Sequence, residues 1–273
     1  MSAPSRPTGP IDFVIGGTQK GGTTALDGYL REHPQICMAR RNAAYFSAAH
    51  PEISAAGQKE VHFFDNEAQF AGGNPDYSQY HRWFDPEHAH VVKGETTPIY
   101  MYWQAAPRRI WEYNPQMKFI LVLRDPIERA YSHWNMERIR NADTMSFWDA
   151  IRNEAERCLE ARPLQHRVYS YISRGLYTQQ LHRIWAYFPK DRTLCLKSEN
   201  LKDGLDETLA RVCDFLQVGP FKGAAPKIAH ALPYESGLTD RERDYLRQVF
   251  APDVRQLEKE LNWDCSEWLS RSR

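Results

Sequence analysis

The sequence lacks an excess of either charge, since 35 lysine and arginine residues balance 35 aspartate and glutamate residues. No global field therefore draws the chain to nucleic acid or to an anionic membrane surface, and any anion site must be local. Long hydrophobic runs are also missing. Pure apolar runs reach only about five residues, as at 119–123, whereas a membrane span needs about 20. These absences predict a soluble protein with neither a nucleic-acid nor a membrane partner.

Cysteine is scarce as well. The cysteines are odd in number, widely separated and never in C-x-x-C spacing, at Cys37, Cys158, Cys195, Cys213 and Cys265. This pattern argues against a disulfide framework and against a zinc cluster, so no metal is expected. Residues 1–10, MSAPSRPTGP, lack the apolar core of a signal peptide and are expected to form a flexible tail. The sequence therefore predicts a reducing, cytoplasmic location.

Hydrophobic residues make up 42% of the 273, enough for one large core. Turn-bounded apolar runs predict strands at 11–16, 91–94, 118–123 and 193–197. Helical periodicity predicts helices at 23–32, 105–113, 126–139, 146–160, 176–188, 205–217 and 239–261, the last with a break considered at Pro252. This alternation predicts one α/β domain over 11–273, with a mostly parallel central sheet flanked by helices. The long irregular stretches, 35–90 and 219–237, are expected to carry function.

The stretch IDFVIGGTQKGGTTALDGYL reads as strand, glycine-rich turn and helix, a P-loop-like arrangement that is typical of phosphate binding. A Walker A loop has the order G-x-x-x-x-G-K-[ST]. Here Lys20 precedes Gly21 and Gly22, and Thr23 and Thr24 follow. The glycines would let a ligand approach the backbone, and the helix dipole would favour an anion. The alternative is a solvated turn capped by Thr23, but it explains neither the glycine pair nor the lysine.

The stretch KFILVLRDPIERAYSHW predicts a buried strand that ends at Arg124, followed by a helix with Asp125 as its N-cap and Pro126 as its first residue. Ligands of doubly wound sheets bind at the carboxyl ends of strands, where the glycine-rich loop also lies. Arg124 and the Ser132 hydroxyl, two turns into the helix, are therefore candidates for holding a second phosphate. The alternative is that Arg124 only pairs with Glu128 or Asp125 on the surface.

A third stretch, KEVHFFD at 59–65, alternates so that Glu60 and His62 would lie on one side of a strand. A carboxylate and an imidazole beside aromatic residues could form a general-base site. The alternative is an ordinary solvated strand face.

The segments TQKGGTTAL, KEVHFFD, GETTPIYMYW and LRDPIERAYSHW, in this order, resemble sulfotransferases that use 3′-phosphoadenosine 5′-phosphosulfate (PAPS). The likeness is strongest to the heparan sulfate glucosaminyl sulfotransferase branch and its soluble bacterial relatives, and GLYTQQLHRIWAYFP, LKSENL and NWDCSEWL extend it over nearly the whole chain. The resemblance implies a sulfotransferase domain with a P-loop-like α/β fold.

The resemblance also implies roles for single residues. The glycine-rich loop would hold the 5′-phosphosulfate, and Arg124 with Ser132 would hold the 3′-phosphate. Lys20 would stabilise the charge that builds on the leaving phosphate without Mg²⁺. Glu60 would be the catalytic base, assisted by His62.

The sequence departs from the family's pattern at several positions. Where many relatives carry E-K-[ST]-P, this chain has Thr96 in place of the lysine, and a substitution by Lys93 is left open. The cysteine pair and K-G-R turn of the heparan sulfate enzymes are missing from FKGAAPKIAHALPYESGL, where Lys222 and Lys227 are candidate PAPS contacts. No counterpart of the membrane anchor of the Golgi enzymes is recognisable. A heparan sulfate acceptor is therefore not inferred.

The acceptor is the least specified part of the prediction. Aromatic-rich segments at 77–84 and 99–103 could line a pocket for a sugar or a flat metabolite. The alternative is that about half of these rings pack in the core. A strongly basic groove for a polyanion is not obvious, so a small hydroxylated or aminated molecule or a carbohydrate is expected. The oligomeric state is left open.

Two other function classes compete. A P-loop kinase or NTPase needs a hydroxyl directly after the loop lysine and an acidic residue at a strand end. Gly21 and Arg124 occupy those positions, which counts against it. A non-catalytic nucleotide-binding protein is the second alternative, and it leaves Glu60 unexplained.

Overall fold

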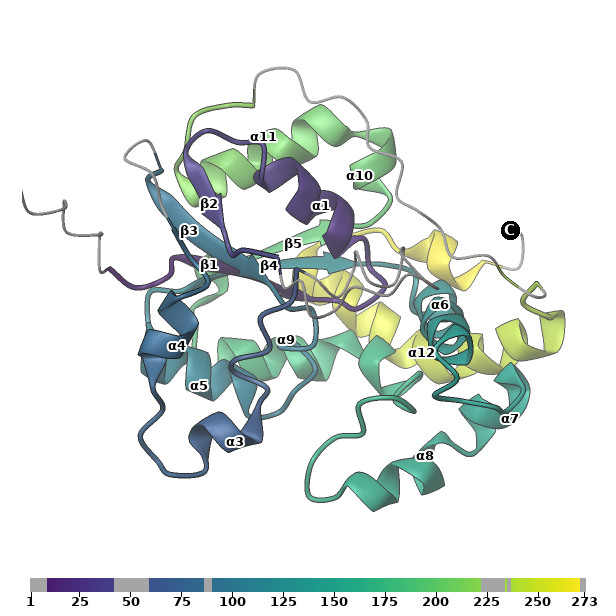
Figure 1. Ribbon diagram of the computed structural model, residues 1–273. Coiled ribbons are helices and arrows are strands. Elements are labelled where there is room, and N and C mark those ends of the chain that lie inside the picture. Colours follow the sequence, from purple (N-terminus) through teal and green to yellow (C-terminus); the bar gives the residue numbers. More distant parts are fainter. Residues whose placement is uncertain (1–8, 42–58, 86–89, 222–233, 235–236, 271–273) are drawn as a thin grey trace, which may run out of the picture.

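The computed structural model describes residues 9–41, 59–85, 90–221, 234 and 237–270. Its five strands form one sheet in the order β2-β3-β1-β4-β5, and all neighbours pair in parallel (Figure 1). The strands are β1 (Phe13–Gly17), β2 (Ile36–Met38), β3 (Val92–Thr96), β4 (Lys118–Leu123) and β5 (Thr193–Lys197). The predicted α/β fold with a parallel sheet is confirmed. Only β2 was not predicted, because three residues are too few to show a pattern.

The helices that the sequence predicted are present with shifted ends. They are α1 (Thr23–Leu30), α5 (Ala106–Tyr113), α6 (Pro126–Ile139), α7 (Phe147–Arg152), α8 (Glu154–Arg157), α9 (Tyr177–Trp185), α11 (Leu205–Leu216) and α12 (Asp240–Leu261). The single helix expected at 146–160 is wrong, since α7, α8 and a 3₁₀ turn share this stretch. Helix α12 runs through Pro252 without a break, and a capping box of Thr239 and Glu242 starts it. The short α3 (Glu67–Phe70), α4 (Tyr77–His81) and α10 (Asn200–Asp203) were not predicted.

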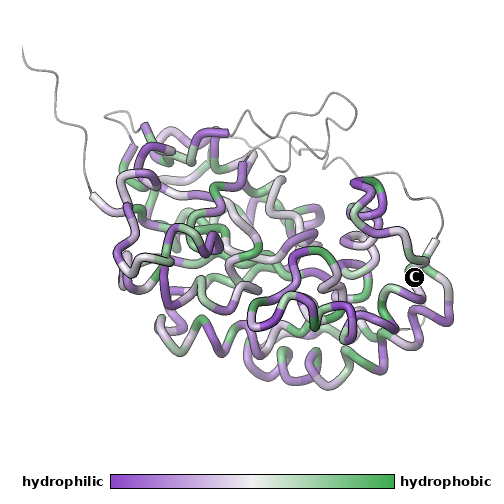
Figure 2. The backbone as a smooth tube through the Cα atoms, turned by 60° about the horizontal axis from the view of Figure 1, so that its bottom comes forward, coloured by the Kyte–Doolittle hydropathy of each residue, from purple (hydrophilic) through white to green (hydrophobic). Residues whose placement is uncertain are grey.

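The sheet separates two hydrophobic clusters. In β4, Phe119 and Leu121 pack into the cluster that contains residues of α5, α6, α9 and α12, whereas Ile120 and Val122 pack into the cluster of α1 and α11. Figure 1 shows α1, α10 and α11 above the sheet and α5, α9 and α12 below it. Figure 2 shows hydrophobic segments through the middle of the molecule and hydrophilic ones mainly at its margin. Because both faces are covered, the central strand β4 contains a continuous apolar run at 119–123.

The order in which the strands are added to the sheet reverses at β1. The chain passes from β1 to β2 and β3 on one side, and then to β4 and β5 on the other. The crevice between β1 and β4 at their carboxyl ends is therefore the position where ligands bind in folds of this kind.

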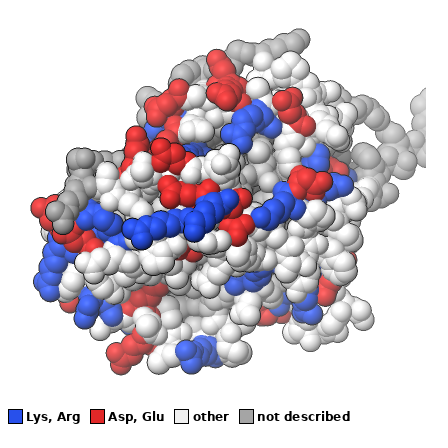
Figure 3. All heavy atoms as spheres, turned by 180° about the vertical axis from the view of Figure 1, so that it is seen from behind, with Lys and Arg blue, Asp and Glu red and all other residues white. Residues whose placement is uncertain are grey.

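The surface carries both charges. On the face in Figure 3, acidic side chains border a row of basic ones. Within the part of the chain that the structure describes, no helix has the length and apolar character that a membrane crossing requires.

Candidate active site

The loop after β1 packs tightly against β4. The Thr18 amide donates to the Val122 carbonyl (3.0 Å), and the Gly21 amide donates to the Thr18 carbonyl (2.9 Å). A Cβ on Gly21 would lie 2.3 Å from the Val122 carbonyl oxygen, and Gly22 has a φ of 104°. Both positions therefore require glycine for the loop's own geometry. This requirement adds to the ligand approach that the sequence suggested.

Gly22, and not Thr23, is the N-cap of α1. The capping role considered for Thr23 is thus wrong, since Thr23 is the first residue of the helix. The N-terminus of α1 has no side-chain cap. Its first amides, which include those of Thr23 and Thr24, are the kind of donors that bind an anion.

Lys20 lies in this loop among other cations. Burial and the nearby Arg140 and Arg124 guanidinium groups lower the pKa of Lys20 to about 8, although Glu137 opposes them. The Lys59 ammonium adds to the repulsion. Cations held this close together favour an anionic ligand, since an anion between them would relieve the repulsion.

The structure brings Arg124 to the same loop. Arg124 Nη1 donates to the Lys20 carbonyl (3.4 Å), and Arg124 Nη2 lies 3.8 Å from Glu128 Oε2. The surface pair considered as an alternative therefore exists, but it is long, and Glu128 also pairs with Arg243 at 2.9 Å. The predicted start of α6 is confirmed, because the Asp125 side chain accepts from the Ile127 amide.

Ser132 is a buried residue of α6. It lies on the helix that follows directly from Arg124 and the end of β4.

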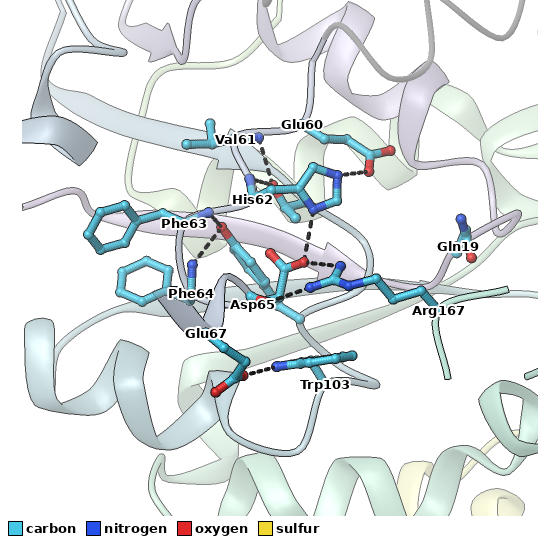
Figure 4. A network of polar contacts seen from close by, with 12 residues as sticks. Gln19, Glu60, Val61, His62, Phe63, Phe64, Asp65, Glu67, Trp103 and Arg167 are labelled. Atoms are coloured by element: carbon cyan, nitrogen blue, oxygen red, sulfur yellow. Dashed lines mark hydrogen bonds and ion pairs between the residues drawn. The ribbon is translucent and has the colours of Figure 1, made fainter. Parts of the chain in front are cut away.

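The segment around Glu60 and His62 is not a strand, so that prediction is wrong. Residues 60–63 have no regular structure, and His62 has a φ of 53°. The two side chains nevertheless meet, since His62 Nε2 lies 3.0 Å from Glu60 Oε2 (Figure 4). His62 Nδ1 binds Asp65 Oδ2 at 3.0 Å. The imidazole therefore bridges two carboxylates.

Side chains from the turn that follows β3 bind the backbone of this segment, which has no neighbouring strand among the described residues. Thr97 Oγ1 accepts from the Val61 amide (3.0 Å), and the Tyr100 hydroxyl accepts from the Phe63 amide (3.1 Å). Both hydroxyls donate to the fully buried Glu95, at 2.6 and 2.9 Å. Burial raises the pKa of Glu95 to about 7, although these hydroxyls oppose the shift. Glu95 thus organises the backbone that carries Glu60 and His62, a role that sequence reasoning missed.

The charges around Glu60 and His62 favour an ionised Glu60 carboxylate and a protonated His62 imidazole at neutral pH. Burial opposes the charged form of Glu60, but the Lys59 ammonium at 3.1 Å and the His62 hydrogen bond hold its pKa at about 2. Burial also opposes the charged form of His62, but hydrogen bonds to Asp65 and Glu60 raise its pKa to about 10. At neutral pH the imidazolium has no lone pair to accept a proton. Glu60 is therefore the better candidate for a base.

A cavity of about 470 Å³ opens beside His62. Its lining includes Asp65, Glu67, Trp103 and Arg167. Trp103 is the one residue of the predicted aromatic segments 77–84 and 99–103 that lines this cavity. More than half of the rings in these segments pack in the core, as the alternative expected for about half, including those of Tyr80, Phe84, Tyr100 and Tyr102.

The lysine absent at Thr96 is not supplied by Lys93. The Thr96 hydroxyl points to α1, where it donates to Asp27 (2.8 Å). Lys93 lies toward the other end of β3, and its ammonium donates to the Gly9 carbonyl (2.6 Å). Lys59, which pairs with Glu60 and repels Lys20, is the buried lysine near the candidate base.

Some predicted residues lie outside the described part of the chain. Lys222 and Lys227 are among them, as are residues 1–8 of the predicted tail. Over the described ranges, no group of three or more His, Cys, Asp and Glu side chains is arranged to hold a metal ion.

Curated relatives carry sulfotransferase names. The chain is 30% identical over 211 residues to "Heparan sulfate glucosamine 3-O-sulfotransferase 3B1" of Mus musculus, a match that covers 74% of this chain and 45% of the relative. It is 26% identical to "Bifunctional heparan sulfate N-deacetylase/N-sulfotransferase 2" of Homo sapiens, over 77% of this chain and 22% of the relative. The chain thus spans only part of the curated relatives that it matches.

A solved structure shares the fold. A sulfotransferase from Alicyclobacillus acidocaldarius superimposes with a TM-score of 0.75 at 24% identity, over 96% of this chain and 100% of that one. The family model described as "Sulfotransferase domain" matches residues 10–236. The chain therefore belongs to the sulfotransferase domain family.

Proposed function

We propose that the protein transfers the sulfuryl group of PAPS to a hydroxyl or amine of a small-molecule or carbohydrate acceptor. The observation that carries this proposal is that one lysine, Lys59, lies near both the Lys20 loop and the candidate base Glu60. Lys59 contributes to the cationic surroundings of Lys20 and is ion-paired with Glu60 at 3.1 Å. The cationic loop and the candidate base are thus adjacent, which supports transfer between a charged donor and an acceptor.

The residues at the loop fit an anionic donor, because Lys20 lies among cations at an uncapped helix N-terminus. In the proposed mechanism, the amides of Gly22, Thr23 and Thr24 bind the 5′-phosphosulfate. Gly21, whose own amide donates to the Thr18 carbonyl, lets the donor approach the loop backbone. Arg124 and Ser132 bind the 3′-phosphate. As the bond between sulfur and the bridging oxygen breaks, Lys20 stabilises the charge that develops on that oxygen.

Acceptor activation falls to Glu60 in this proposal. Glu60 takes the proton of the acceptor hydroxyl or amine while the new bond to sulfur forms. In the free protein, the Lys59 ammonium at 3.1 Å and the His62 imidazole at 3.0 Å hold the pKa of this carboxylate at about 2, although burial opposes them. Efficient proton transfer therefore requires the bound acceptor to weaken this pairing. His62 keeps the carboxylate oriented through its hydrogen bond.

The competing functions fit the site less well. A kinase-like role needs a hydroxyl after the loop lysine and an acidic residue at the end of β4, where Gly21 and Arg124 stand. A purely nucleotide-binding role leaves the Glu60–His62–Asp65 group without a purpose. The names of the curated relatives favour a carbohydrate acceptor. The cytoplasmic location is a prediction from the cysteine pattern.

Donor specificity tests the two separate anion sites. Adenosine 3′,5′-bisphosphate is expected to raise the melting temperature more than adenosine 5′-phosphate does. Each lost charge-assisted contact costs about 1.5–3 kcal/mol, so the bisphosphate should bind at least ~10-fold more tightly. Thermal shift and calorimetry measure both quantities. Equal stabilisation by ATP with Mg²⁺ would instead favour the kinase-like reading.

A further inference from the structure

The segment 162–176, which includes a 3₁₀ turn at Ser173–Gly175, connects the two halves of the proposed site. Within it, the buried Arg174 donates from Nη1 to the Gln19 side chain, next to Lys20, and from Nη2 to the Arg167 carbonyl (2.7 Å). Arg174 Nε donates to Ser170 Oγ (2.7 Å). The backbone at Arg167 is therefore fixed to the donor loop.

The side chain of Arg167 reaches the other half. Arg167 Nη1 donates to Asp65 Oδ2 at 2.6 Å, the same oxygen that binds His62 Nδ1 at 3.0 Å (Figure 4). The Arg167 guanidinium also lies over the Trp103 ring, 4.4 Å from its centroid. The Arg167 side chain is 46% exposed, whereas that of Asp65 is fully buried. The Trp103 ring thus packs against one face of the Arg167 guanidinium, and the edge of the guanidinium holds the buried Asp65 carboxylate.

We infer that Arg167 is a positioning residue for the catalytic group. It holds Asp65 in the orientation that aims the His62 imidazole at Glu60, and it forms one wall of the acceptor cavity. This inference rests on the proposed function for its kinetic consequence, but its geometric content does not. A buried carboxylate with one fixed oxygen has a defined direction, and that direction sets the ring orientation of the histidine bound to it.

The charged groups around Glu60 and His62 define what the loss of Arg167 should change. They are Lys59 beside Glu60, Asp65 beside His62, Arg167 beside Asp65, and Glu95 behind the segment. In Arg167→Met, Asp65 loses its fixed position and the imidazole is no longer aimed at Glu60. The carboxylate of Glu60 then loses a hydrogen bond that favours its charged form, so its pKa rises.

The kinetic experiment compares Arg167→Met and Arg167→Lys with wild type, using labelled PAPS and the best acceptor found. We expect kcat to fall about 10- to 100-fold in Arg167→Met. The acid limb of kcat/KM should move to higher pH, because it reports the base of the free enzyme and the pKa of Glu60 rises in this variant. Arg167→Lys keeps a donor beside Asp65 and should recover most of both changes. The dissociation constant of adenosine 3′,5′-bisphosphate should stay within about 2-fold, which shows that each variant is folded.

Arg108→Met is the matched control, because Arg108 is an exposed arginine whose side chain lies 3.6 Å from Glu112 on the same helix. It should leave kcat and the acid limb unchanged. If the Arg167→Met variant binds the bisphosphate and shows only a higher KM for the acceptor, Arg167 merely lines the cavity and does not position the catalytic group. That result overturns the inference and leaves the proposed function intact.

A second readout needs no turnover. In ¹⁵N-labelled protein without substrates, the His62 Nδ1 proton should give a slowly exchanging downfield resonance, since it is held by Asp65. This resonance should disappear or broaden in Arg167→Met and persist in Arg108→Met. Its persistence in Arg167→Met would overturn the inference. If the wild type shows the resonance but transfers no sulfuryl group, the proposed function fails and the positioning role stands.

Discussion

Glu60→Gln is expected to lower kcat by about 10²–10⁴, the range that the loss of a general base produces. Glutamine keeps the size and hydrogen bonding of the side chain but removes the basic carboxylate. The binding of adenosine 3′,5′-bisphosphate should be nearly unchanged, because Glu60 is assigned to the acceptor. Steady-state kinetics and calorimetry on the same preparation measure the two effects separately.

His62→Ala decides between the two candidate bases. His62 is protonated at neutral pH, with its pKa raised to about 10 by its two carboxylate partners, so it cannot accept a proton there. We expect a smaller loss of kcat in His62→Ala than in Glu60→Gln. The opposite order, with a crippled His62→Ala and a normal Glu60→Gln, would make the histidine the base. Near-normal kcat in both would remove this segment from the catalytic site.

Lys20→Ala should damage binding and turnover together, because the same ammonium meets the 5′-phosphate in the ground and transition states. The loss of one charge-assisted contact weakens bisphosphate binding by about 1.5–3 kcal/mol. The absence of the Lys20 ammonium at the leaving oxygen should lower kcat by about 10²–10³. Lys93→Ala is the matched control, since Lys93 contacts the Gly9 carbonyl and lies toward the opposite end of β3. Equal effects of both variants would contradict the role of Lys20.

The role of Lys20 also has a pH signature. Its pKa is about 8 in the free protein, and a bound anion favours the charged form, so the pKa rises on binding. Binding therefore takes up a proton above about pH 8, and bisphosphate affinity should fall as the pH rises through this value. Calorimetry in buffers with different ionisation enthalpies detects the uptake. Lys20→Ala should abolish it.

The fold was predictable where packing leaves a strong pattern. Strand β1 and nearly all of β4 are buried on both faces, so they appear as apolar runs between turns. Strands β3 and β5 are only partly buried and show shorter apolar stretches. Strand β2 and the short helices α3, α4 and α10 have too few residues to show periodicity. The break considered at Pro252 is absent.

The site was predictable in part for topological reasons. Parallel strands bring their carboxyl ends to one edge, so the Lys20 loop and Arg124 were expected together, and the contact between Arg124 and the Lys20 carbonyl bears this out. Glu60 and His62 meet as expected but not on a strand, because Thr97 and Tyr100 bind the backbone where a neighbouring strand would. Arg167 reaches Asp65 across 102 residues of sequence, and no local pattern could indicate that contact.

The most direct test of the account follows labelled sulfuryl groups from PAPS in the presence of EDTA. The acceptor panel contains uncharged hydroxylated glycosides, aromatic alcohols, amines and heparan sulfate. The account predicts that wild-type protein labels at least one acceptor in the chelator, because Lys20 supplies the charge at the leaving group, and that Glu60→Gln transfers label at least 100-fold more slowly. Activity that disappears in EDTA and returns with Mg²⁺, or turnover of ATP with Mg²⁺ in place of PAPS, would contradict it.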